Sequence, residues 1–187
     1  MSIDQSYNNY RKIEMINGVE IVMMSPPFSN HNDVKENILH IFRTYLKGNV
    51  CRAYGDNRKV VLEENTYVVP DFFVLCDRSK RKRDGIYGPP DMIAEVLSPS
   101  TEKIDRGEKR DLYQRVGVKE YWIVEPNKKV IEVYLLKSGV YILDAVYRIP
   151  AEYEPLEDKE KEPCEFEASL FKGLIIKLCD VFEDVVD

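Results

Sequence analysis

Two carboxylates lie in apolar stretches of the chain where a charged side chain is costly. Asp71 belongs to residues 69–75 (VPDFFVL), and Glu95 belongs to residues 93–97 (IAEVL). A buried, ionised carboxylate without a partner loses its hydration and is strongly destabilising. The two acids therefore predict one shared cation. Their hard oxygens, joined by a backbone carbonyl near Val96, suit Mg²⁺, with Mn²⁺ as its substitute.

A lysine follows on a predicted helix. Asp105, Lys109 and Tyr113 recur every four residues, in one stripe with Leu112, so Lys109 is expected to point toward the sheet. Two carboxylates with Mg²⁺ and an ammonium group suit phosphodiester hydrolysis, because the cation activates water and the ammonium offsets charge in the transition state. The alternative is that Asp105 and Glu108 form a capping box and Lys109 stays in solvent.

Four further side chains are candidate auxiliary groups of this site: Glu14, His31, Asp105 and Tyr113. Glu14 lies on the predicted opening strand, and His31 lies near the start of the first predicted helix. The ordinary interpretations are a solvated glutamate, a surface histidine, a helix cap and a core tyrosine, respectively.

A basic run joins the two acidic strands. It consists of Arg78, Lys80, Arg81, Lys82 and Arg83. A charge run is commonly a solvated loop, but this one leaves the sheet between the two proposed metal ligands. It is therefore a candidate for holding nucleic-acid phosphates, with an affinity that falls steeply with salt.

Hydrophobic periodicity predicts strands and helices in an irregular order. Helices are expected over residues 30–47 and from 102 or 105 to 116, with a short closing helix at 181–186. Strands are expected at 13–16, 19–24, 51–54, 59–62, 67–69, 72–75, 92–97, 120–124, 130–136, 140–146 and 174–178. Asn17-Gly18 predicts a tight hairpin turn between the first two strands.

These motifs together resemble a known family. The matching residues are Glu14, Gly18, residues 24–27, His31, Pro70-Asp71, residues 95–101, Asp105, Gly107, Lys109, Tyr113, residues 117–118, residues 120–122, Pro126, Phe171 and Gly173. They are similar to the signature of the Uma-two family of restriction-endonuclease-like proteins, within the PD-(D/E)XK nuclease superfamily. The resemblance covers nearly the whole chain.

The resemblance implies an α/β (α+β) fold: a restriction-endonuclease-like mixed central β-sheet flanked by helices, with extra β-hairpins. It also implies a Mg²⁺-dependent site with Asp71 and Glu95 as metal ligands. In one respect the chain departs from the superfamily, whose lysine stands two residues after the second acid, where this chain has Leu97. The lysine role is therefore assigned to Lys109 on the helix, with Lys103 as the fallback.

The net charge of −6 is concentrated in one segment. Residues 150–167 alone carry that net charge, and the remainder of the chain is balanced. This stretch is expected to be an acidic surface connection within a single domain spanning residues 1–187, so the acidic pI does not argue against a nucleic-acid partner.

The cysteines and the hydropathy pattern indicate little special chemistry. Cys51, Cys76, Cys164 and Cys179 are widely spaced, and buried or idle thiols are expected rather than zinc ligands or disulfides. No apolar run reaches the roughly 20 residues of a membrane helix, so no membrane partner and a cytoplasmic location are expected.

The leading hypothesis is a Mg²⁺-dependent deoxyribonuclease of the PD-(D/E)XK type that hydrolyses DNA phosphodiester bonds, with Asp71, Glu95 and Lys109 as catalytic residues. The alternative is an inactive nuclease-fold module for DNA binding or protein interaction, motivated by Leu97 and the acidic segment. A small-molecule binder that uses the same cleft has no positive motif. A homodimer is expected through the apolar hairpins.

Overall fold

The computed structural model describes residues 12–23, 28–151, 154–155 and 162–186. The helical segments are α1 (Ser29–Tyr45), η2 (Arg78–Lys80), α2 (Glu102–Ile104), η3 (Asp105–Lys109), α3 (Arg110–Val116) and α5 (Leu178–Val181). The strands are β1 (Lys12–Ile16), β2 (Val19–Met23), β3 (Arg52–Gly55), β4 (Val60–Glu63), β5 (Thr66–Val68), β6 (Phe72–Leu75), β7 (Ile86–Tyr87), β8 (Met92–Val96), β9 (Glu120–Glu125), β10 (Val130–Lys137), β11 (Val140–Arg148), β12 (Glu165–Glu167) and β13 (Ile175–Lys177).

The largest sheet carries the two acidic segments next to each other. Its six strands lie in the order β11-β10-β9-β8-β6-β3, with β8 and β9 parallel and the other pairs antiparallel. The parallel pair needs a crossover, which α2, η3 and α3 provide. The predicted mixed central sheet flanked by helices is confirmed, and the two strands expected to be neighbours, β6 and β8, are hydrogen-bonded.

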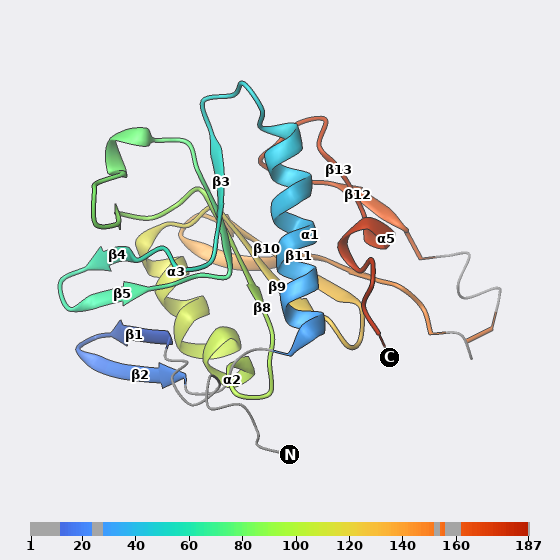
Figure 1. Cartoon of the computed structure of the whole chain (residues 1–187), viewed down its shortest axis with the longest axis horizontal. Helices are drawn as coiled ribbons and strands as arrows, with labels where there is room; N and C mark the ends of the chain where they lie inside the picture. The colour runs from blue at the N-terminus through green and yellow to red at the C-terminus, as the bar shows by residue number, and fades with distance from the viewer. Residues whose placement is uncertain (1–11, 24–27, 152–153, 156–161, 187) are drawn as a thin grey trace, which may run out of the picture.

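Each face of this sheet is covered by a different layer (Figure 1). Helix α1 crosses one face, where Phe42 packs between Phe72 and Trp122. The opposite face packs against α3 and a smaller sheet, through a second core that includes Tyr113 and Tyr121. Because side chains alternate along a strand, β6 and β8 are apolar on both faces, as expected for central strands.

The smaller sheet has the order β2-β1-β5-β4-β7. Its first hairpin turns at Asn17 and Gly18, which both have positive φ, 52° and 79°, as the predicted two-residue turn requires. A single pairing, Met15 with Tyr67, joins β1 to β5. This sheet thereby brings the N-terminal strand, with Lys12 and Glu14 on one of its faces, beside the acidic end of β6.

The predicted second helix forms, but it is not a regular α-helix. Its middle is a π-helical turn, η3, and Gly117 ends α3 in the left-handed conformation at φ 86°. Gly107 lies in this turn, and a Cβ built there would meet nothing within 4 Å. A close approach of another backbone therefore does not explain this glycine. Single π-turns inside helices are frequent at functional sites.

Several sequence predictions were incomplete or wrong. The polar loop between the acidic strands contains η2 and the short strand β7, and β12 was not predicted. The closing helix begins at Leu178, earlier than expected. The motif at residues 24–27 lies outside the described residues, as do residues 152–153 and 156–161 of the acidic segment at 150–167. None of the described helices has the length and hydrophobicity to cross a membrane.

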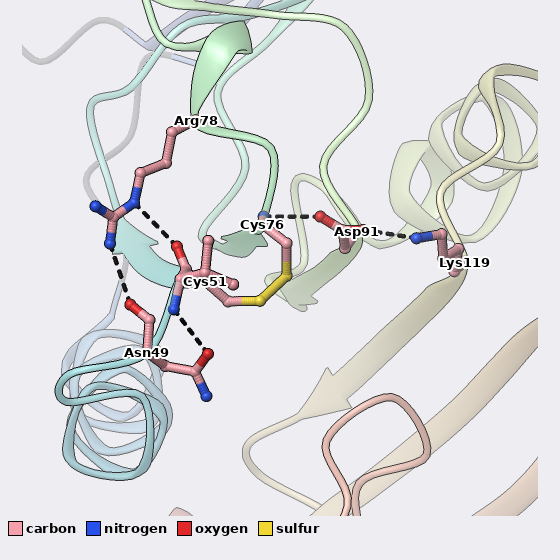
Figure 2. The surroundings of a disulfide bond; sticks show 7 residues. Asn49, Cys51, Cys76, Arg78, Asp91 and Lys119 are labelled. Atoms are coloured by element: carbon pink, nitrogen blue, oxygen red, sulfur yellow. Dashed lines mark hydrogen bonds and ion pairs between the residues drawn. A yellow bond between two sulfur atoms is a disulfide. The ribbon is translucent and has the colours of Figure 1, made fainter.

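The expectation of idle thiols is wrong for two cysteines. Cys51 and Cys76 form a disulfide that joins the start of β3 to the end of β6 (Figure 2). The two positions follow from the β3–β6 register, which pairs Arg52 with Leu75 and so sets the cysteines opposite each other. Sequence alone could not pair them, because they are 25 residues apart and the register was unknown. Cys164 and Cys179 are free and exposed rather than buried.

Thiol titration of the unreduced, denatured protein is expected to find two reactive cysteines of the four. Because the bond closes a loop of 25 residues, replacing Cys51 and Cys76 with serine should lower the free energy of unfolding by about 3 kcal/mol. Denaturant titration measures this, with the double replacement of Cys164 and Cys179 by serine as the control. Four reactive thiols, or equal loss in both double variants, would contradict the pairing.

Candidate active site

Asp71 and Glu95 face each other across two antiparallel strands. The β6–β8 register pairs Phe72 with Ala94, so Asp71 lies opposite Glu95 and both side chains leave the same face of the sheet. The backbone N–H of Asp71 donates to Glu95 Oε2 at 3.2 Å, and the N–H of Val96 donates to Asp71 Oδ2 at 3.0 Å. Both carboxylates are buried. The Val96 backbone thus contacts Asp71 through its N–H group, and the Val96 carbonyl stays a predicted ligand.

Lys109 lies at the centre of three carboxylates. Its Nζ is 3.0 Å from Glu14 Oε2, 3.1 Å from Glu95 Oε1 and 3.1 Å from Asp105 Oδ1. The side chain is only 1% exposed. The interpretation of Lys109 as a solvated side chain and of Asp105 as a simple helix cap is therefore wrong. Leu97, at the position of the superfamily's lysine, is buried in the apolar core. The ammonium group beside Glu95 comes instead from Lys109 on the helical segment.

The other auxiliary candidates also converge here. Glu14 is buried, and its Oε1 accepts from the N–H of Val69 at 2.8 Å. Tyr113 donates to Glu95 Oε1 at 2.6 Å, so it orients the acid rather than the lysine. His31 is buried at the start of α1, with its Nε2 3.3 Å from Asp71 Oδ2. The ordinary interpretations of Glu14 as solvated and His31 as a surface residue are wrong.

Lys12 belongs to the site but was not predicted. Its Nζ is 3.0 Å from Asp71 Oδ1. A signal was present, because Lys12 stands two residues before Glu14 and a strand puts both on one face.

The fallback lysine, Lys103, is exposed at α2, and the structure gives it no ion pair with a described residue.

The pKa values of the buried acids shift in opposite directions. Burial alone would raise the pKa of Asp71, but Lys12 and His31 outweigh it and hold that pKa well below its usual range. Burial raises the pKa of Glu95 to about 8, with a further contribution from Asp71 and Asp105 and opposition from Lys109. Burial likewise raises the pKa of Asp105, although Lys109 opposes it. The charged form is thus favoured for Asp71, whereas burial favours the protonated form of Glu95.

The cluster holds more acidic than basic side chains, which would suit a divalent cation. Four acids, Glu14, Asp71, Glu95 and Asp105, lie beside two ammonium groups, from Lys12 and Lys109, and the imidazole of His31 lies beside Asp71. Glu14 Oε2 and Asp105 Oδ1 both contact Lys109 Nζ, at 3.0 and 3.1 Å, so one ammonium group serves both oxygens. With all four acids ionised, a charge of +2 beside Asp71 and Glu95 would balance the negative charge that the two ammonium groups leave.

Asp71 and Glu95 offer hard oxygen donors rather than sulfur or nitrogen. In the described part of the chain, no group of three or more His, Cys, Asp or Glu side chains is arranged as a metal cage. A cation here would be held by the two facing carboxylates and backbone oxygen. Mg²⁺ is commonly held by one or two carboxylates while it keeps several waters.

The predicted basic residues lie away from the acids. Residues 78–83 form η2 and the short stretch after it. They follow Cys76, at the end of β6 that carries the disulfide. Asp71 lies at the opposite end of that strand. Lys80 donates to the carbonyl of Pro89 at 2.8 Å, so it has a structural contact, whereas Arg81, Lys82 and Arg83 are exposed.

The fold and the acid and lysine cluster define a protein of the nuclease-fold class. Residues 3–166 match the family model Uma2, described as "Putative restriction endonuclease". The chain belongs to this Uma2 family, as its motifs predicted.

The chain is also similar to one solved structure and to two curated proteins. A crystal structure from Anabaena variabilis ATCC 29413, described as "a putative nuclease belonging to DUF820", matches with a TM-score of 0.67 and 19% identity over 91% of this chain and 89% of that one. It supports the fold. Two uncharacterised proteins of Synechocystis sp. (strain ATCC 27184 / PCC 6803 / Kazusa) are also similar. The protein slr1290 is 31% identical over 62% of both chains, and sll1609 is 26% identical over 66% of this chain and 71% of its own length. The chain thus spans 62% of the length of slr1290.

Proposed function

We propose that this protein is a Mg²⁺-dependent endonuclease that hydrolyses DNA phosphodiester bonds. The observation that carries the proposal is the pair of facing carboxylates, Asp71 and Glu95, with Lys109 3.1 Å from Glu95. Membership of a family described as "Putative restriction endonuclease" supports the same chemistry.

Different residues of the site would bind the metal, orient the nucleophile and orient Glu95. Asp71, whose charged form is favoured by Lys12 and His31, and Glu95 would hold Mg²⁺, with the Val96 carbonyl as a further oxygen ligand. Bound Mg²⁺ supplies Lewis acidity toward water and toward a phosphoryl oxygen. Lys109 is fixed by Glu14 and Asp105, and its ammonium group would orient the nucleophile and offset charge that develops on the phosphate. Tyr113 would orient Glu95.

The test is cleavage of supercoiled plasmid in Mg²⁺ or Mn²⁺, compared with EDTA. We expect Asp71→Asn to lose cleavage by a factor of about 10³ or more, because metal-held charge stabilisation supplies several kcal/mol of the transition-state stabilisation. The matched control is Asp111→Asn, which removes a carboxylate from the exposed side of α3. Equal cleavage by wild type and Asp71→Asn would refute the assignment. Mg²⁺ should also raise the melting temperature of wild type but not of Asp71→Asn.

A second candidate function is a nuclease-fold module that binds DNA without turnover. It is favoured by the contacts of Asp71, whose two oxygens already accept from Lys12, His31 and the Val96 N–H. Metal binding seen by calorimetry, without cleavage of plasmid, single strands or RNA, would favour this module.

We also propose a homodimer in the cytoplasm. The large sheet ends in β11, which exposes Val140, Ile142, Leu143 and Val146. An exposed apolar edge strand is a natural pairing surface. Light scattering at micromolar concentration tests the dimer. The cytoplasm is reducing, and disulfides are uncommon there. Alkylation at the moment of cell lysis therefore tests the location: modified Cys51 and Cys76 would support the cytoplasm, and unmodified, bonded cysteines would oppose it.

A further inference from the structure

Four neighbouring hollows form one groove, called here the cationic groove. The first is lined by Lys12 and Lys59, and the second shares Lys59 with it. The second and third share Arg81, and the third and fourth share Arg52. The fourth reaches Lys47, just beyond the end of α1. Because Lys12 contacts Asp71, the groove starts at the candidate active site.

The arginines of this groove differ from the other described arginines in their partners. Those that line the groove are Arg43, Arg52, Arg58, Arg78, Arg81 and Arg83. Within the described residues, none of these six has a carboxylate oxygen within 4.0 Å. The other described arginines, Arg106, Arg110, Arg115 and Arg148, all form ion pairs with Asp or Glu. The unpaired guanidinium groups are therefore gathered on one surface.

The fold holds the groove walls in place. Arg78 donates from Nε to the carbonyl of Val50 at 3.0 Å and from an Nη to that of Asn49 at 3.1 Å, beside the disulfide (Figure 2). These two bonds fix the guanidinium while leaving three of its five donors for a ligand. On the other wall, a Cβ on Gly85 would lie 2.9 Å from the carbonyl oxygen of Lys59, so only glycine lets the basic loop come this close.

Ordered, unpaired guanidinium groups are suited to phosphate. Arginine offers a planar fork of donors that matches a phosphate group, and binding releases the counterions that surround the nucleic acid. Asp84 is the one acidic residue among the described residues that line the four hollows, and it accepts a hydrogen bond from Tyr87. The charge of the groove therefore suits an extended polyanion, and Lys12 at one end of the groove contacts Asp71.

We propose that the cationic groove binds the phosphates of duplex DNA on one side of the cleaved bond. The proposal deepens the proposed function, on which it rests, and it extends the basic run to residues from α1, β3 and the β3–β4 connection. DNA would thus be gripped asymmetrically, from the active site at Lys12 toward Arg78 and Lys47.

The test measures binding in EDTA, so that no cleavage intervenes. A fluorescent duplex of about 30 base pairs is titrated with protein between about 50 and 200 mM KCl. The groove variant combines Arg58→Gln, Arg78→Gln and Arg81→Gln. The control combines Lys128→Gln, Lys137→Gln and Lys177→Gln, which removes the same charge from exposed positions outside the four hollows.

The groove variant is expected to bind at least about tenfold more weakly than wild type at low salt, with the slope of log affinity against log salt reduced by about 3. Arg81→Gln alone should reduce that slope by about 1. The control should stay within about twofold of wild type. Equal losses in groove variant and control, or tighter binding of duplex RNA than of DNA with the same sequence, would overturn the proposal.

Plasmid cleavage separates this result from the nuclease assignment. A wild type that cuts plasmid, with a groove variant that binds and cuts equally well, overturns the groove alone. A wild type whose binding depends on the groove, but which never cuts in Mg²⁺ or Mn²⁺, overturns the nuclease and leaves the groove supported.

Discussion

Replacing Glu95 with glutamine is expected to abolish cleavage while making the metal-free protein more stable. Glu95 is buried, and its pKa is raised to about 8 from an ordinary value of 4.5. At pH 7 the folded protein must therefore keep a proton that the unfolded chain releases, which costs roughly 3 kcal/mol. Glutamine removes this cost. It loses about one hydrogen bond, since an amide cannot accept at both ends, so the net gain is roughly 2 kcal/mol.

The sign of the pH dependence follows from the raised pKa. The contribution of Glu95 to stability is greatest below pH 4.5, decreases as the pH rises toward 8 and is constant above that. The Glu95→Gln variant should lack this slope, and at pH 7 in EDTA it should melt about 4–8 °C higher than wild type. Thermal unfolding at pH 5 and pH 7, with plasmid cleavage on the same samples, checks both effects. A variant that melts lower at pH 7, or that still cuts, would contradict the assignment.

The acidic pair could be predicted from the sequence because strands have a simple period. Asp71 and Glu95 interrupt apolar runs, and neighbouring strands were enough to place them together. The helix stripe similarly placed Lys109 toward the sheet. In each case a charged residue occurs within an apolar strand or helix pattern, which indicates that its side chain is buried.

The remaining parts of the site depend on long-range contacts that no local pattern encodes. Lys12 reaches Asp71 because β1 pairs with β5 through one residue pair, and that pairing depends on the whole small sheet. The Cys51–Cys76 bond depends on the β3–β6 register. A π-helical turn, η3, spans Asp105 to Lys109 within the predicted helix, and the periodicity of the sequence did not indicate it. Propensities at single positions do not contain this information.

Replacing Lys109 with methionine is expected to have the opposite effect on stability from the Glu95 variant. The ammonium group is the common partner of Glu14, Glu95 and Asp105, and all four side chains are buried. Removing one member of a buried ionic cluster leaves uncompensated charge and costs about 3–5 kcal/mol. Burial already raises the pKa of Asp105 while Lys109 opposes the rise. Without the lysine this acid takes up a proton more readily, so Lys109→Met should recover stability as the pH falls from 7 toward 5.

Denaturant unfolding at pH 7 and pH 5 measures this difference. The matched control is Lys103→Met, an exposed position of the same helical segment, which should change stability by less than about 0.5 kcal/mol. The double variant of Lys109→Met with Glu95→Gln should recover part of the loss, because residues of one cluster are not additive. Equal stability of Lys109→Met and wild type at pH 7, or no recovery in the double variant, would show that Lys109 does not neutralise the acids. The two substitutions are thus expected to have opposite signs, because Glu95→Gln removes the cost of burying an acid whereas Lys109→Met removes the partner of three acids.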